Sequence, residues 1–225
     1  MNDLDKAFDA IRNKRPQLDL MWSYVQGPQP LRYSTERLTE YFQNINTHFE
    51  LNWLTVVVDS VLDRLQLSGF DVEDDAINER LAILFDKLHL DIEADKAHYS
   101  SLSTSQSYLI VWKDGEEIVA YYNDPRMCAV FYDPAKPNRK LYAAKWFNHA
   151  DGKQEITLYY PERLEHWVSQ KMQTGTGIDK ASMFTLESTE SNPYGVIPVF
   201  ELKSQGEIFK VVTIQDAINK LFADM

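Results

Sequence analysis

The sequence predicts an α+β fold, with N-terminal helices packed on an antiparallel β-meander and the start of a further helix at the end of the chain. As far as residue 102, apolar residues recur at the three-and-four spacing of helices. From residue 104 onward, short apolar runs are separated by turn residues, which is the pattern of strands and hairpins. Helices first and strands second are typical of the α+β class. With 225 residues, 44% of them hydrophobic and 12% aromatic, the chain can bury one sizeable core or two small ones.

Charge and cysteine usage exclude several classes of protein. Lys and Arg total 23 against 34 for Asp and Glu, so the net charge of -11 lacks the clustered cations of a duplex-wrapping protein. Cys128 is the only cysteine, which excludes an intrachain disulfide and a four-thiolate zinc site, and its apolar neighbours predict a buried strand thiol. The N-terminus carries charges where a signal peptide needs an apolar run, and no apolar run reaches membrane-spanning length. We therefore expect a protein that is made and kept in a cytoplasm, without a membrane partner.

The first 30 residues predict a mobile N-terminal arm. An amphipathic patch at Leu4, Phe8 and Ile11 is followed by a break at residues 27–30, Gly-Pro-Gln-Pro. The segment 21–24, Met-Trp-Ser-Tyr, is too apolar for a free tail. We expect it to dock on the main body or on a neighbouring subunit.

Residues Leu51 to Phe70 form the densest apolar segment and predict a buried amphipathic helix. Five apolar residues share one helical face, namely Leu54, Val58, Val61, Leu62 and Leu65. Ser68-Gly69 is a natural C-terminal stop for this helix. The β-branched run 56–58 leaves a strand as the alternative.

Four more helices are expected. Ser34 or Thr35 caps one that runs through Leu38, Tyr41, Phe42 and Ile45. Asp74 or Asp75 caps the next, whose inner face comprises Ile77, Leu81, Leu84, Phe85 and Leu88. A polar-sided helix follows from about Asp91 to Leu102. A last helical pattern starts at Thr213 and continues to Met225 without a cap, so we expect either a fragment of a longer protein or the product of a shortened gene.

The strand region opens with a strong hairpin signal. Residues 107–112 and 117–122 are joined by Lys113-Asp114-Gly115, and Asp-Gly supplies the positive φ values of a tight turn. Further strands are expected at 128–132, 140–147, 155–160 and 196–202, the last at a sheet edge because it contains Pro198. Residues 171–191, rich in Gly, Ser and Thr, predict a long surface loop.

No motif demands catalysis. None of the five histidines forms the helical pair of a metalloprotease, and the phosphate-loop-like segment 175–182 has Asp179 before its lysine. The best enzymatic candidate is a metal-dependent nuclease, in which Glu201 and Lys203 act with Asp124 or Asp133 on a divalent ion. The alternative is that Glu201 and Lys203 are solvated strand residues.

Several short segments recur in a fixed order from about Tyr33 to Met225. They are Tyr33, Glu36-Arg37-Leu38, Asn52-Trp53, Val57-Val58-Asp59, Asp63-Arg64-Leu65, Gly69-Phe70, Ser107 to Trp112, Asp124-Pro125, Tyr132-Asp133-Pro134, Tyr160 to Leu164, Asn192 to Val199, Gln215 to Lys220 and Ala223-Asp224-Met225. Each alone is weak, whereas the colinear series is specific. In the order and identity of its residues the series resembles the portal proteins of tailed bacteriophages, in the large family found in siphophage-type heads.

The resemblance implies a ring, usually a dodecamer, at one vertex of the capsid. Through its channel the terminase drives double-stranded DNA without sequence-specific binding, and scaffold or capsid protein and head–tail connector proteins dock on it. It implies a virion protein assembled in the host cytoplasm, with no catalytic site, no cofactor and no metal. Relatives are roughly twice as long, so residues 31–212 are expected to form a wing-like domain, residues 1–30 an arm, and residues 213–225 the start of a helix towards a stem.

The matched positions are expected to be fold determinants rather than DNA contacts. They are Asn52, Trp53, Asp59, Asp63, Arg64, Gly69, Tyr108, Trp112, Asp124, Pro125, Asn192, Pro193, Gly195, Pro198, Asp216 and Asn219. The two glycines suit turns, and Trp53, Val57, Val58 and Leu65 suit a core. Asp63 and Arg64 form either an intersubunit pair or a solvated helix pair. A nuclease and a small interaction domain without ring formation remain the competing functions.

Overall fold

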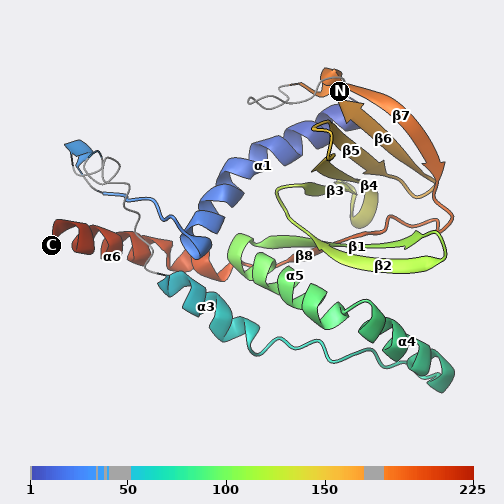
Figure 1. Ribbon diagram of the computed structural model, residues 1–225, viewed down its shortest axis with the longest axis horizontal. Coiled ribbons are helices and arrows are strands. Elements are labelled where there is room, and N and C mark those ends of the chain that lie inside the picture. Colours follow the sequence, from blue (N-terminus) through green and yellow to red (C-terminus); the bar gives the residue numbers. More distant parts are fainter. Residues whose placement is uncertain (1, 34, 38–39, 41–51, 170–179) are drawn as a thin grey trace. The chain divides into compact units, whose positions relative to one another are not determined.

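The computed structural model describes residues 2–33, 35–37, 40, 52–169 and 180–225, and it has the predicted α+β fold (Figure 1). The α-helices are α1 (Asp3–Gln26), α3 (Trp53–Leu62), α4 (Asp75–Lys87), α5 (Leu90–Thr104) and α6 (Val212–Asp224), with 3-10 helices η1 (Ala181–Met183) and η2 (Glu207–Lys210). The strands are β1 (Gln106–Asp114), β2 (Glu117–Asn123), β3 (Cys128–Asp133), β4 (Lys136–Asn148), β5 (Gln154–Tyr159), β6 (Arg163–Ser169), β7 (Phe184–Ser191) and β8 (Val199–Lys203). The expected helix through Ile45 and the segment 175–179 lie outside the described residues.

The chain divides into two compact units. Unit 1 comprises Met1–Arg15 and Tyr108–Glu201, and unit 2 comprises Pro16–Ser107 and Leu202–Met225. Helix α1 changes unit at Pro16, a proline inside the helix. The expected division into arm, wing-like domain and stem-directed helix stays a prediction.

Unit 1 contains two sheets. The predicted hairpin is confirmed, because β1 and β2 pair antiparallel from Tyr108↔Asn123 to Asp114↔Glu117, and β8 is the other neighbour of β1. Strand β8 lies at a sheet edge, as predicted, although it begins at Val199 and Pro198 precedes it. The second sheet is an antiparallel meander in the order β3-β4-β5-β6-β7.

The meander buries both of its faces. Because successive side chains point to opposite faces, Tyr142, Ala144 and Trp146 of β4 lie on one face with Ile156 and Leu158 of β5. The other face carries Ala143, Tyr159 and Leu164, which pack with Tyr108 and Ile110 from the hairpin. Cys128 belongs to this second core and is fully buried, as predicted.

The first turns of α1, as far as Arg15, pack into unit 1 and are not a mobile leader. Leu4, Phe8 and Ile11 lie on one face of α1 and are at most 4% exposed in the first core of unit 1. The Phe8 ring stacks on Trp146 with centroids 5.0 Å apart. The prediction of a mobile leader is wrong because its amphipathic patch is long enough to cover a sheet face.

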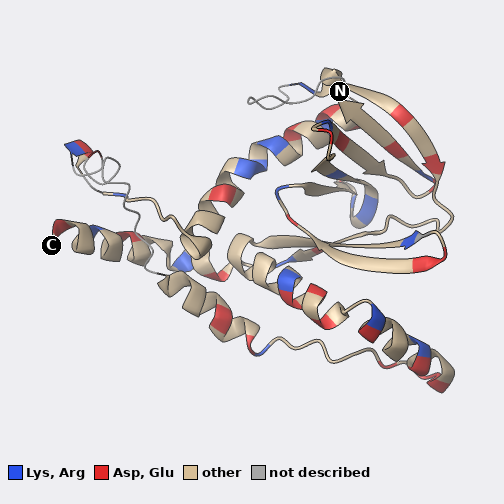
Figure 2. Ribbon diagram, viewed as in Figure 1, with Lys and Arg blue, Asp and Glu red and all other residues tan. Residues whose placement is uncertain are grey.

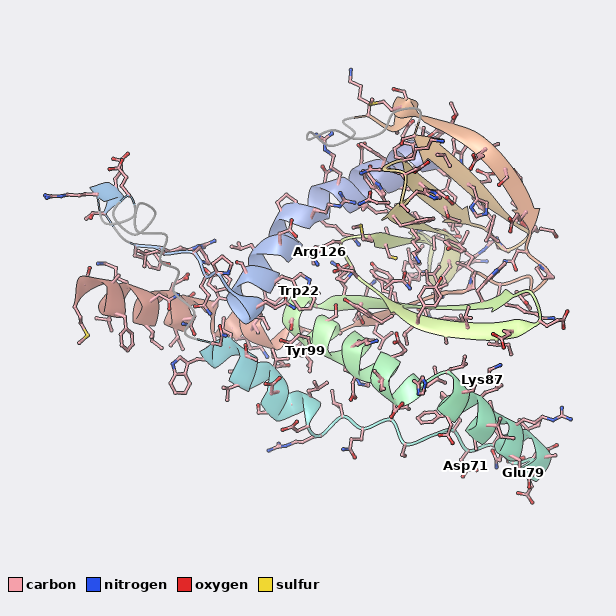
Figure 3. The ribbon with its side chains drawn as sticks, viewed as in Figure 1. Trp22, Asp71, Glu79, Lys87, Tyr99 and Arg126 are labelled. Carbon is pink, nitrogen blue, oxygen red and sulfur yellow. The ribbon has the colours of Figure 1, made fainter. Side chains whose placement is uncertain are left out.

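Unit 2 is a cluster of helices around a third core. Met21, Tyr24 and Val25 of α1 pack with residues of α3, α5 and η2, namely Leu54, Val58, Leu102 and Ile208. Trp22 stacks on Tyr99 of α5, with ring centroids 5.9 Å apart (Figure 3). The apolar segment 21–24 therefore docks within this chain.

The central helix is shorter than predicted. Helix α3 ends at Leu62, where Arg64 and Leu65 donate backbone bonds to the carbonyls three residues earlier and tighten the last turn. Leu65 thus follows the helix and is 38% exposed, so its expected core position is wrong. Trp53, in the first turn, is 60% exposed and is likewise not a core residue of unit 2. Leu54 and Val58 are buried as expected.

Helices α4 and α5 start and stop close to the predicted residues. Asp74 caps α4 by accepting from the backbone of Ala76 and Ile77, and His89 separates the two helices with φ 48°. The expected inner face of α4 contains no fully buried residue: Ile77 is exposed, the other four residues are half-buried, and the Phe70 ring lies 6.1 Å from the Phe85 ring. Figure 2 shows cations and anions interspersed along α4, as on a solvated helix.

Two strands lie where no strand was expected. Strand β6 was not predicted, and β7 occupies the second half of the predicted loop. In β7 only Phe184 is buried, so the strand has no alternation of apolar and polar residues to detect. The prediction of a loop over 184–191 is wrong for this reason.

Candidate functional site

The matched residues of α6 form a buried polar network in unit 2. Asp216 and Asn219 are at most 1% exposed. The Tyr24 hydroxyl donates to Asp216 Oδ1 at 2.6 Å, and Asn219 Nδ2 donates to Gln29 Oε1 at 2.9 Å. Gln215 Nε2 donates to Asn219 Oδ1 at 2.9 Å. Burial and the bond to Asp216 raise the pKa of Tyr24, so its hydroxyl remains a donor. This network ties the segment after α1 to α6.

A second matched group builds the turn before β8 in unit 1. Asn192 is buried, and its Nδ2 donates to the carbonyls of Tyr160 and Val196 at 2.9 and 2.7 Å. Its Oδ1 accepts from the backbone of Tyr194 at 3.1 Å. Gly195 has φ +64°, a conformation that L side chains rarely adopt. Pro193 and Pro198 flank this turn, so the expectation of a structural role fits its geometry.

Asp124 and Pro125 form a tight turn between β2 and β3. Asp124 Oδ1 accepts from the backbone of Arg126 at 2.8 Å, and its Oδ2 lies 2.6 Å from the Arg126 guanidinium. The backbone of Met127 donates to the Asp124 carbonyl at 2.9 Å. The carboxylate is therefore engaged in a local pair that orders the turn.

Glu201, the proposed nuclease carboxylate, lies in a polar network of unit 1. Tyr108 and Tyr132 donate their hydroxyls to its two oxygens, each at 3.0 Å. Lys14 of α1 donates to the Cys128 carbonyl, and its Nζ lies 3.4 Å from the Tyr108 hydroxyl. Burial lowers the pKa of Lys14 to about 8, although the nearby Glu201 and Asp124 favour its charged form.

This network differs from a nuclease metal site. Burial, assisted by Glu201, raises the pKa of Tyr132 to about 12 and also raises the pKa of Tyr108, so both hydroxyls donate at neutral pH. Both carboxylate oxygens therefore already accept hydrogen bonds. In the described ranges, no three histidine, cysteine, aspartate or glutamate residues are placed to hold a metal ion. The sequence did not indicate Lys14, because a lysine on an amphipathic helix normally lies in solvent.

A further polar cluster lies on the second face of the meander. The Glu155 carboxylate accepts at 2.6 Å from His166 Nδ1, at 2.8 Å from His149 Nε2 and at 2.8 Å from the Thr157 hydroxyl. Burial raises the pKa of Glu155, but the hydrogen bonds from His166, Thr157 and His149 outweigh it, and the pKa lies below its usual value. Glu155, Thr157 and His166 line a cavity of about 200 Å³ together with Lys145 and Glu190. Sequence analysis missed it, because only the strand register brings these residues together.

Each unit also presents an apolar groove. In unit 1 the groove encloses about 290 Å³ and is lined by Val111, Trp112, Ile118, Tyr194 and Phe200, among others. The matched Trp112 packs edge to face on Tyr194, with ring centroids 5.6 Å apart. In unit 2 a groove of about 210 Å³ lies between α3 and α6 and includes the exposed Trp53.

The remaining matched residues lie on the surface of unit 2. Asn52 is the N-cap residue of α3 and Asp63 its C-cap residue, while Asp59 and Arg64 are exposed. Gly69 has φ +146° in the segment between α3 and α4. None of the described helices combines the length and apolar character needed to cross a bilayer.

Comparison with known proteins assigns the chain to a family. A family model described as "Phage portal protein, SPP1 Gp6-like" matches residues 6–225. No curated protein matches the chain. The family match begins earlier than the colinear series, within α1. Because it spans nearly the whole chain, this protein belongs to the SPP1 Gp6-like family of phage portal proteins, which are structural proteins rather than enzymes.

Proposed function

We propose that this chain is part of a subunit of the portal ring at one capsid vertex, through which the phage genome is packaged and ejected. The observation that carries the proposal is the family match over residues 6–225. In the virion such a ring is usually a dodecamer, assembled in the host cytoplasm. Terminase docks on it during packaging, scaffold or capsid protein surrounds it, and head–tail connector proteins attach to it afterwards.

The chemistry of the matched residues supports a structural role. Asp216, Asn219 and Asn192 use their polar groups to bond other parts of the chain, and Asp124 pairs with Arg126. Groups engaged in this way hold a fold together. The formal charge of -11 also suits a channel wall along which a polyanion slides without being gripped.

Ring assembly is tested by negative-stain microscopy and mass photometry of the protein expressed from its complete reading frame. We expect rings with a central hole and a mass that is an integral multiple of the subunit mass. A product that stays monomeric at all concentrations would favour a small interaction domain over a portal. As a control for catalysis, plasmid DNA incubated with the protein and Mg²⁺ or Mn²⁺ should remain intact.

Asp63 and Arg64 give a residue-level test of the ring. Both are exposed at the end of α3, and we propose that they pair across subunits. Reversing one charge, Asp63→Arg, should weaken assembly, and the double exchange with Arg64→Asp should restore it. The charge reversal Asp86→Arg, on the solvated helix α4, is the matched control. If all these variants assemble equally well, Asp63 and Arg64 are a solvated pair and do not pair across subunits.

A further inference from the structure

The polar cluster around Glu155 contains a ring nitrogen without a partner. His166 Nδ1 lies 2.6 Å from Glu155 Oε1, so this nitrogen carries a proton and donates it to the carboxylate. The other nitrogen, Nε2, is buried and has no hydrogen-bond partner among the described residues. Glu190 Oε1 lies 3.8 Å from it. In a neutral imidazole Nε2 is an acceptor, so two acceptors face each other here.

The charges around His166 come from every element that packs on it. The titratable groups are Glu155 and Tyr159 from β5, Lys145 from β4, His149 after β4, Glu190 from β7 and Tyr121 from β2. The Lys145 ammonium lies over the Tyr121 ring, 4.7 Å from its centroid. The two carboxylates and the one ammonium leave a net charge of about -1 around the two histidines.

Glu190 belongs to the edge strand of the meander. Strand β7 pairs only with β6 in the described sheet, with Leu164 opposite Glu190 and His166 opposite Ser188. The strand is exposed apart from Phe184, and Figure 2 shows acidic residues along it. The Glu190 side chain is 61% exposed, so it is free to rotate towards Nε2.

We propose that His166 is a proton-operated latch that fastens the edge strand β7 to β6. When Nε2 gains a proton it becomes a donor to Glu190, while Glu155 holds the ring and balances its charge. When Nε2 loses the proton, the ring and Glu190 are two acceptors and the contact opens. The latch lies within unit 1 and its operation does not depend on ring assembly.

Hydrogen exchange tests the latch directly. Amide protection of residues 184–191, corrected for intrinsic exchange rates, is measured at about pH 7.5 and about pH 5.5, across the range in which histidine ordinarily titrates. In the wild-type protein we expect protection of this strand to rise about five-fold on acidification, as for a well-formed surface ion pair. Nitrogen-15 NMR of the histidine rings follows the protonation of His166 in the same samples.

Two single-amide variants separate the latch from a general effect of charge. In Glu190→Gln, the side-chain amide donates to neutral Nε2, so protection should be high at both pH values and its pH dependence should disappear. The matched control Glu187→Gln removes a carboxylate from the same exposed strand and should keep the five-fold rise. No rise in the wild type, or the same rise in both variants, would overturn the proposal.

Discussion

Removing one hydroxyl from the core of unit 2 tests the network that ties α6 to the segment after α1. The Tyr24 side chain is 0% exposed and Asp216 is 1% exposed, and their oxygens are 2.6 Å apart. Tyr24→Phe leaves the Asp216 carboxylate buried with one donor fewer. A hydrogen bond to a charged group contributes about 1.5–3 kcal/mol, so we expect the free energy of unfolding to fall by about 2–3 kcal/mol.

The measurement is urea unfolding followed by tryptophan fluorescence, with Tyr33→Phe as the matched control. The Tyr33 side chain is 64% exposed, so the same chemical change there should alter the free energy of unfolding by less than about 0.5 kcal/mol. Asp216→Asn keeps an acceptor for the Tyr24 hydroxyl but removes the negative charge. The double variant Tyr24→Phe/Asp216→Asn should lose less unfolding free energy than the sum of the losses in the two single variants. Equal stabilities of Tyr24→Phe and Tyr33→Phe would refute the reasoning.

Four further predictions concern unit 1. The pKa of Lys14 is about 8 in the folded chain against its ordinary 10.5, so between these pH values the unfolded chain binds more protons than the folded chain. The free energy of unfolding, measured by urea titration, should therefore rise by about 2 kcal/mol from pH 8 to pH 10. The variant Lys14→Met should not show this rise. Because the pKa of Glu155 is lower in the folded chain than in the unfolded chain, its carboxylate stabilises the fold above the unfolded-state pKa, and this stabilisation is lost as the pH falls through the folded-state pKa. Acid unfolding of Glu155→Gln should lack this contribution. Phe8→Ala should lower the unfolding free energy by about 3–5 kcal/mol in the same urea assay, against less than about 1 kcal/mol for the half-exposed Phe222→Ala. The Cys128 thiol is fully buried and burial raises its pKa to about 12, so a thiol reagent should react with it only in urea, and fast reaction of the native protein would contradict the packing.

The parts of the fold that the sequence predicted are those governed by local chemistry. The Asp-Gly signal predicted the β1–β2 hairpin, and the two-residue turn is Gly115-Glu116, in which Gly115 has a positive φ and Asp114 is the last residue of β1. Asp74 began α4 because its short carboxylate reaches two free backbone N–H groups. In both cases the signal and the structure lie within a few residues of each other.

The wrong predictions share a different cause. Leu65 has the spacing of a core residue, but α3 ends three residues earlier. The last turn of α3 is set by backbone hydrogen bonds, which the pattern of apolar residues does not indicate. Strand β7 is held by its pairing with β6 rather than by an apolar face. The first turns of α1 are ordered by a sheet more than 100 residues away in sequence. Tertiary contacts decided each of these elements.

The site residues divide in the same way. Asn192 and Gly195 were expected in a turn, and the turn is local. The partners of Asp216 and Glu201 were not predictable, because Tyr24 and Tyr108 reach them across 192 and 93 residues of sequence. The family resemblance supplied the identity of the matched positions, and the structure explains why several of them are buried.

The central claim, that this protein forms part of the portal vertex, is tested most directly by immunogold electron microscopy of phage particles with antibodies raised against this chain. Particles are opened gently, so that an internal ring is accessible, and intact particles serve as the control. We predict gold at a single vertex per capsid, at the junction of head and tail. Label spread over the whole shell, or its absence from opened particles that contain the capsid protein, would contradict the account.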